Sequence, residues 1–219
     1  RSVIVFWIYF PVVALFLFIF MSVIHFGLCD WSYLELGKYK WSISITHGLN
    51  IVFGIIFFHT NETFEIFAFL SNSSFIHLQN YLFIAYFFYF ILLLRYSYLA
   101  FIVPKLRWGL LEIIIVLLIV FLTEPLVGFS IYFCFIHTFK HVKSILNDTS
   151  KYLSNNKFVT ITTISFTLLT WIGGSLAIVY LYNNYSFEES FIKTLFIGIA
   201  ALTLPHMTLV DIFYRKKFN

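Results

Sequence analysis

Residues 3–28 read VIVFWIYFPVVALFLFIFMSVIHFGL and contain no Asp, Glu, Lys or Arg. A helix needs about 20 consecutive apolar residues to cross the hydrocarbon layer of a bilayer, so this stretch is long enough to span a membrane. It is too long for a signal peptide, and it lacks a small-residue cleavage site. The stretch therefore predicts a transmembrane helix, and this prediction determines how we interpret the rest of the chain.

The composition of the whole chain is that of a membrane protein. The 219 residues are 61% hydrophobic, 22% aromatic and only 11% charged, with a mean hydropathy of +0.91. A soluble domain carries about 25% charged residues, and a disordered chain is poor in aromatic residues, so the composition excludes both classes. We interpret the net charge of +4 as a signal of membrane topology rather than of nucleic-acid binding.

Six further apolar stretches follow the first. We expect transmembrane helices at about 3–28, 43–59, 78–100, 109–123, 125–141, 158–181 and 190–212. Thr123-Glu124-Pro125 separates the fourth from the fifth, because Pro lacks a backbone N–H and pushes the preceding residue out of the helical region. No internal repeat or low-complexity linker divides the chain. The sequence thus predicts an all-α polytopic membrane helix bundle that forms one domain over residues 1–219.

Basic residues are shared unequally between the two faces of this predicted bundle. One face receives the segments 29–42, 101–108, 142–157 and 213–219 and most of the Lys and Arg, whereas only Arg1 and Lys193 lie near the other. Because cytoplasmic loops are enriched in Lys and Arg, we expect the first face in the cytoplasm. The prediction is a multi-pass protein of the cell (inner) membrane with a cytoplasmic C-terminus.

Five histidines fall in the cytoplasmic third of the predicted bundle. They are His25, His47, His137, His141 and His206, whereas His59 and His77 fall on the opposite face. Ionisable groups at membrane depth are costly and usually functional. His137 and His141 are spaced i, i+4, so their imidazoles share one helix face, as two ligands of one metal do. The alternative for this pair is a position among the lipid headgroups, beside Lys140 and Lys143.

Two acids each follow one of these histidines by five residues. Asp30 follows His25, and Asp211 follows His206. Each carboxylate could accept the ring N–H of a metal ligand and fix its tautomer, and a solvated carboxylate at a helix end is the alternative for each. An all-imidazole site suits iron, copper or zinc, and redox chemistry on an apolar substrate favours iron.

The segments that hold these histidines resemble the Brp/Blh family of membrane β-carotene 15,15′-dioxygenases, a family named for its association with bacteriorhodopsin. The resemblance is carried by HFGLCD at 25–30, YFCFIHTFKH at 132–141, FIGIAALTLPHM at 196–207, THG at 46–48 and WIGG at 171–174. It covers nearly the whole chain, with the motifs in the family's order. Family members carry a further helix before this region, so the resemblance implies that this chain lacks the first family helix.

The resemblance implies cleavage of β-carotene by O2 at its central 15,15′ double bond, giving two molecules of all-trans-retinal. The implied enzyme is an oxidoreductase that uses non-haem Fe(II), with a functional link to a retinal-binding rhodopsin. Family iron ligands are histidines, and His25, His137 and His141 match them position by position. Candidates for a further ligand or for support of the ligands are His206, His47, Asp30 and Asp211.

The protein must hold a long polyene so that only its middle reaches the metal, in a slot between helices that opens to the lipid. Candidate residues to line this slot are Phe26, Tyr132, Phe133 and Trp171. A retinal-binding photoreceptor would need a lysine in the middle of the last span, where the chain has none. The remaining alternative is a membrane transporter of metal ions or protons that uses the same histidine cluster.

Overall fold

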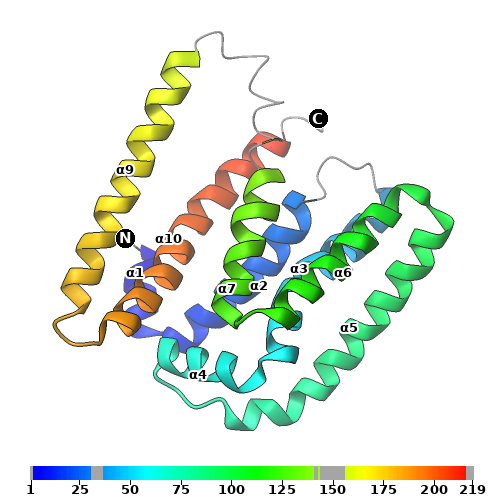
Figure 1. Ribbon diagram of the computed structural model, residues 1–219, viewed down its shortest axis with the longest axis horizontal. Coiled ribbons are helices and arrows are strands. Elements are labelled where there is room, and N and C mark those ends of the chain that lie inside the picture. Colours follow the sequence, from blue (N-terminus) through cyan, green and yellow to red (C-terminus); the bar gives the residue numbers. More distant parts are fainter. Residues whose placement is uncertain (1, 31–36, 141–142, 144–155, 216–219) are drawn as a thin grey trace. The chain divides into compact units, whose positions relative to one another are not determined.

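The computed structural model describes residues 2–30, 37–140, 143 and 156–215, and every regular element in this part is helical (Figure 1). The α-helices are α1 (Ser2–Tyr9), α2 (Pro11–Asp30), α3 (Lys40–Phe58), α4 (Thr60–Ser71), α5 (Ile76–Ile102), α6 (Arg107–Leu122), α7 (Pro125–Ile131), α9 (Asn156–Leu181) and α10 (Phe187–Arg215). Two 3₁₀ turns, η1 (Gly37–Tyr39) and η2 (Pro104–Leu106), precede α3 and α6, and a π-helical turn, η3 (Tyr132–His137), follows α7. The predicted all-α class is confirmed.

Four helices in the described part are long and apolar enough to cross a membrane. The qualifying stretches are Pro11–Asp30, Lys40–Phe58, Asn80–Ile102 and Ile164–Leu181. They correspond to the first, second, third and sixth spans expected from the sequence. The other three expected spans are helical over most of their described residues, and that they also cross the membrane stays a prediction.

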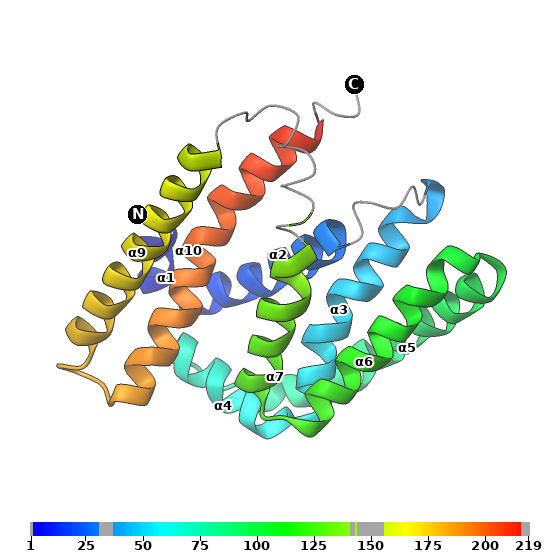
Figure 2. The ribbon, with the colours of Figure 1, turned by 45° about the horizontal axis from the view of Figure 1, so that its top comes forward.

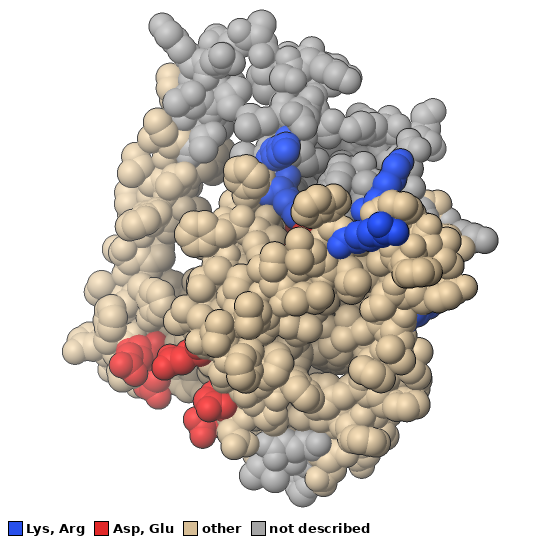
Figure 3. Space-filling view, turned by 45° about the vertical axis from the view of Figure 1, so that its right-hand side comes forward, with Lys and Arg blue, Asp and Glu red and all other residues tan. Residues whose placement is uncertain are grey.

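The outer surface of these helices suits a lipid environment. Large apolar side chains such as Phe83, Phe101 and Trp171 are 74–80% exposed, which is unfavourable in water. Figure 3 shows a broad uncharged surface, with most of the Lys and Arg side chains of this face in its upper part and Asp and Glu side chains at its lower left. A surface of this kind is expected where a helix bundle contacts acyl chains.

The first expected span is divided at Pro11. Helix α1 ends at Tyr9 and α2 begins at Pro11, although the hydrogen bonds from the N–H of Phe10 to Phe6 O and of Ala14 to Phe10 O, both 2.9 Å, continue across the break. Pro has no N–H and its ring clashes with the preceding turn. The single uninterrupted helix expected at 3–28 is therefore two helices.

Helix α4 occupies part of the segment 60–77, which lies between two expected spans and was not expected to be helical. Phe64 and Leu70 are buried, whereas Asn61 and Glu62 are exposed, so the helix is amphipathic. Asn72 ends it with φ 52° and ψ 36°, a left-handed conformation that Asn tolerates better than most residues.

The chain divides into two compact units. The larger one, Leu15–Asn147, contains most of α2 and all of α3 to α7, and the smaller one consists of Arg1–Ala14 and Asp148–Asn219. In the smaller unit α10 packs against both α9 and α1, and Figures 1 and 2 show α9 and α10 side by side. A capping box starts α10: Ser186 N–H donates to Glu189 Oε2 at 2.9 Å, and Glu189 N–H donates to Ser186 Oγ at 3.3 Å. That the whole chain forms one domain stays a prediction.

Helix α3 is the centre of the larger unit and packs against α4, α5, α6 and α7. One apolar cluster joins Ile43, Tyr96, Leu99, Ala100, Leu106 and Ile113, and a second joins Phe26, Ile51, Val116, Val120 and Tyr132. A polar contact also crosses these helices, because Asn50 donates to Ile113 O at 3.3 Å and accepts from the Tyr89 hydroxyl at 2.5 Å. Such interhelical hydrogen bonds stabilise helix packing where water is absent.

Two glycines let α2 and α3 touch through their backbones. A Cβ on Gly27 would lie 2.0 Å from Ser44 O, and a Cβ on Gly48 would lie 1.8 Å from Val23 O. Small residues at helix crossings allow this close approach in membrane proteins. Since His25 precedes Gly27 by two residues and His47 directly precedes Gly48, this crossing fixes the helices that carry both histidines.

Candidate metal centre

His25 and His137 lie against each other inside the larger unit. His25 is on α2 and His137 ends the π turn η3, and their ring centroids are 5.1 Å apart at an interplanar angle of 66°. The two side chains are 6% and 3% exposed. The structure therefore brings together two of the three histidines expected to bind iron, which are 112 residues apart in the sequence.

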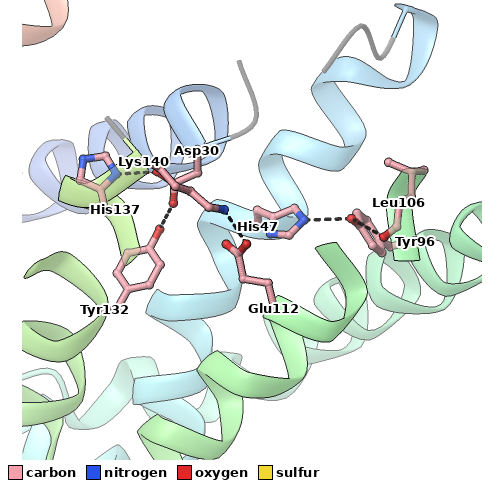
Figure 4. Close-up of polar contacts among 8 residues, drawn as sticks. All are labelled: Asp30, His47, Tyr96, Leu106, Glu112, Tyr132, His137 and Lys140. Atoms are coloured by element: carbon pink, nitrogen blue, oxygen red, sulfur yellow. Dashed lines mark hydrogen bonds and ion pairs between the residues drawn. The ribbon is translucent and has the colours of Figure 1, made fainter. Parts of the chain in front are cut away.

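Asp30 supports this pair from the end of α2. Its Oδ1 accepts from Nδ1 of His137 at 2.7 Å, and its Oδ2 accepts from the Tyr132 hydroxyl at 2.8 Å (Figure 4). With the proton held on Nδ1, His137 would bind a metal through Nε2, which is the usual arrangement of a carboxylate behind a histidine ligand. Asp30 thus contacts an imidazole as the sequence suggested, but that of His137 rather than its near neighbour His25.

His25 has a different partner on its own helix. Its Nδ1 lies 3.4 Å from Sγ of Cys29, one turn further along α2, and both side chains are buried. A thiol is a weak donor and a weak acceptor, so this contact orients the ring less firmly than a carboxylate would.

The π turn explains why Tyr132 and His137 both reach Asp30. In an α-helix, residues five apart differ by about 140° around the axis. A π turn closes i→i+5 hydrogen bonds instead, so residues five apart lie on nearly the same face. The rings of Tyr132 and His137 accordingly stack at 26°, with centroids 6.4 Å apart. No motif in the sequence signals this turn, and it was not expected.

Aromatic side chains surround His137. Phe26 packs edge-on against it with centroids 4.7 Å apart, and Phe133 stacks on it at 5.6 Å and 29°. Phe26, Tyr132 and Phe133, three of the four residues expected to line a substrate slot, thus lie at the histidine pair. Trp171 belongs to α9 in the smaller unit and is 74% exposed. That any of the four contacts a substrate stays a prediction.

His47 belongs to a second polar network. Its Nε2 lies 3.1 Å from the hydroxyl of Tyr96, which donates to Leu106 O at 3.3 Å (Figure 4). Because the hydroxyl has a single proton, it can donate to Leu106 O or to His47 Nε2 but not to both. His47 is thus held by Tyr96 of α5, away from the contact between His137 and Asp30.

A charged pair connects α6 to the helix that carries His137. Lys140 Nζ donates to Glu112 Oε2 at 2.5 Å, and the two side chains are 22% and 20% exposed (Figure 4). A mostly buried charge is tolerated when its partner is present and costly when the partner is removed. The pair therefore holds α6 against the helical residues that directly follow η3.

The Lys140→Met variant should unfold at a lower temperature than the wild type, because it leaves the Glu112 carboxylate mostly buried without its cation. We expect a loss of about 1–3 kcal/mol, typical of a buried polar group that loses its partner. Adding Glu112→Gln should recover part of this loss. Thermal unfolding in detergent measures both, and a double variant less stable than Lys140→Met would contradict the interpretation of a compensating pair.

The remaining candidate residues are not placed by the structure. His141 lies outside the described residues, and the side chains of His206 and Asp211, both on α10, are not described. Among the described residues no group of three or more His, Cys, Asp and Glu is placed to hold a metal ion. The pair of His25 and His137 fits a first-row metal in its donor chemistry, because both imidazoles are buried and one is oriented by a carboxylate.

Comparison with known proteins gives one family. The model of the family described as beta-carotene 15,15'-dioxygenase matches residues 2–214. A curated protein of the same name from an uncultured marine bacterium 66A03 is 29% identical to this chain over 210 residues, which cover 95% of this chain and 75% of that protein. No solved structure matches.

Proposed function

Because the chain belongs to the β-carotene 15,15′-dioxygenase family, we propose that it cleaves β-carotene at the central 15,15′ double bond with O2, giving two molecules of all-trans-retinal. The observation that carries this proposal is the buried pair of His25 and His137 backed by Asp30. The pair lies inside the region matched by the family, and aromatic side chains surround it.

We propose that His25 and His137 hold a non-haem Fe(II) ion, with His141 as a third ligand and His47 or His206 as candidates to complete the set. Iron held by neutral imidazoles would supply the redox chemistry that makes O2 reactive toward an alkene. Asp30 keeps the proton of His137 on Nδ1, so the metal-binding nitrogen stays Nε2. The Phe26 and Phe133 rings keep water away from His137.

The substrate is apolar and dissolves in the bilayer, so the chain must act within a membrane. Four described helices are long and apolar enough to cross a membrane, and their outer surfaces are apolar. We propose a multi-pass protein of the inner membrane whose C-terminus is cytoplasmic, as the distribution of Lys and Arg indicates. The product all-trans-retinal would then be released where a retinal-binding rhodopsin could take it up.

Expression in cells that accumulate β-carotene tests the proposal. We expect the cells to lose their carotenoid colour and to form all-trans-retinal, identified by chromatography, only when oxygen is supplied. Cells that express the His25→Ala variant should keep their β-carotene. Retained β-carotene with uptake of metal ions into the cells would instead favour the transporter interpretation.

A further inference from the structure

Tyr132 is enclosed between the aromatic residues around His137 and the carboxylate of Asp30. The side chain is 4% exposed, and its ring meets Phe26 edge-on with centroids 5.4 Å apart. Its hydroxyl donates to Oδ2 of Asp30 at 2.8 Å. A tyrosine this buried, whose polar atom bonds a carboxylate of the same site, offers little surface to a substrate.

Asp30 is the acceptor of two hydrogen bonds that arrive on different oxygens. One comes from Tyr132 and the other, at 2.7 Å, from Nδ1 of His137. The terminal torsion of an aspartate is broad, so a single hydrogen bond leaves the plane of the carboxylate poorly fixed. A second hydrogen bond on the other oxygen fixes that plane, and with it the direction of the bond to His137.

We infer that Tyr132 is a positioning residue whose hydroxyl holds Asp30 so that Asp30 in turn fixes the ring of His137. The inference rests on the proposed function in that His137 is the residue that binds the metal. It assigns Tyr132 to the support of His137 rather than to the substrate slot. Both donors come from the same π turn and the acceptor comes from α2, so the contact also ties the two helices together at the site.

The Tyr132→Phe variant tests this inference, because it removes only the hydroxyl. Tyr89→Phe is the matched control: Tyr89 is also buried, and its hydroxyl bonds Asn50, which belongs to a different network. The measurement is a titration of the purified 219-residue chain in detergent with Co²⁺ alone, followed by the visible absorption of the bound ion. We expect Tyr132→Phe to weaken Co²⁺ binding about tenfold, as for other residues that support a metal ligand. Tyr89→Phe should change the binding by less than about twofold, as distant sites do.

A double variant shows whether the hydroxyl acts through Asp30. Asp30→Asn alone should weaken Co²⁺ binding at least as much as Tyr132→Phe. Adding Tyr132→Phe to Asp30→Asn should cost no more than about a further twofold, because the two residues share one contact. If the loss of Co²⁺ affinity in the double variant equals the product of the losses in the two single variants, the inference is wrong.

The outcomes separate the inference from the proposed function. If the wild type forms retinal and binds Co²⁺ but Tyr132→Phe binds it as tightly as Tyr89→Phe, the inference is wrong and the proposed function stands. If Tyr132→Phe weakens Co²⁺ binding while the wild type forms no retinal, the inference stands and the proposed function fails. A wild type that binds no Co²⁺ overturns the inference. A Tyr132→Phe variant that does not fold while Tyr89→Phe does would assign the hydroxyl to the fold and overturn it too.

Discussion

The His137→Ala variant is expected to form no detectable retinal and to bind metal more than about 100-fold more weakly than the wild type. This loss exceeds the range for supporting residues because a proposed ligand itself is removed. The imidazole is nearly fully buried against His25, and its Nδ1–H donates to Oδ1 of Asp30 at 2.7 Å. The substitution therefore removes a metal-binding nitrogen and leaves a buried carboxylate with one partner fewer. Retinal yield in β-carotene-producing cells and Co²⁺ affinity of the purified chain measure the two effects.

His59→Asn is the matched control for this variant. His59 is also a histidine of the larger unit, although only partly buried, and it lies at the junction of α3 and α4, where its Nε2 donates to Val120 O at 2.8 Å. Removing this ring should leave metal affinity and retinal formation close to the wild type. Equal retinal yields from His137→Ala and the wild type would show that His137 is a packed core histidine and not a ligand.

The Gly48→Ala variant should lose the fold of the larger unit. The added Cβ would lie 1.8 Å from the carbonyl oxygen of Val23, and a backbone atom can only move with its whole helix. Overpacking usually costs about 1–3 kcal/mol, and we expect a Cβ that clashes with the backbone of another helix to cost more than this. We expect little folded protein to be extracted from the membrane, as judged by size-exclusion chromatography, and no retinal. Gly27→Ala, with its Cβ 2.0 Å from Ser44 O, should behave in the same way.

Gly173→Ala is the control for both glycine variants. Gly173 is also inside a long apolar helix, but apart from its own helix backbone and chain neighbours no atom of the described residues lies within 4 Å of the Cβ that the substitution adds. This variant should be extracted in wild-type amount, since alanine is the better helix former. Equal yields of Gly48→Ala and Gly173→Ala would mean that the backbones of α2 and α3 do not touch at Gly48.

The fold class follows from the sequence because long apolar segments between polar ones leave helices as the only structure the chain can form across a bilayer. Length and hydropathy placed α3, α5 and α9 within a few residues of their observed bounds. The break at Pro11 was missed because its neighbours are as apolar on one side as on the other. Helix α4 was missed because its 12 residues are amphipathic and too short to resemble a span.

The site was only partly predictable for a different reason. Sorting the histidines by membrane depth brought His25 and His137 to one layer, but depth does not say which side of a helix a residue occupies. Asp30 was expected near an imidazole because it follows His25 by five residues, yet the fold pairs it with His137 from another helix. The contact of Tyr132 with Asp30 depends on a π turn, and helical spacing alone would not have aligned the two donors.

Two neighbouring helices of the larger unit have very different lengths. Helix α5 has 27 residues and α6 has 16, which correspond to about 40 Å and about 24 Å of helix against a hydrocarbon layer of about 30 Å. If α6 crosses the bilayer as the sequence predicts, these two helices, which are joined by η2 and packed together, cannot both match one flat bilayer. In that case α5 would tilt, and the lipid around α6 would become thinner to meet its ends. Glu112 lies in the first half of α6, so a thinned bilayer would bring headgroups and water toward its pair with Lys140, and the thickness of the host membrane would influence the stability of this pair.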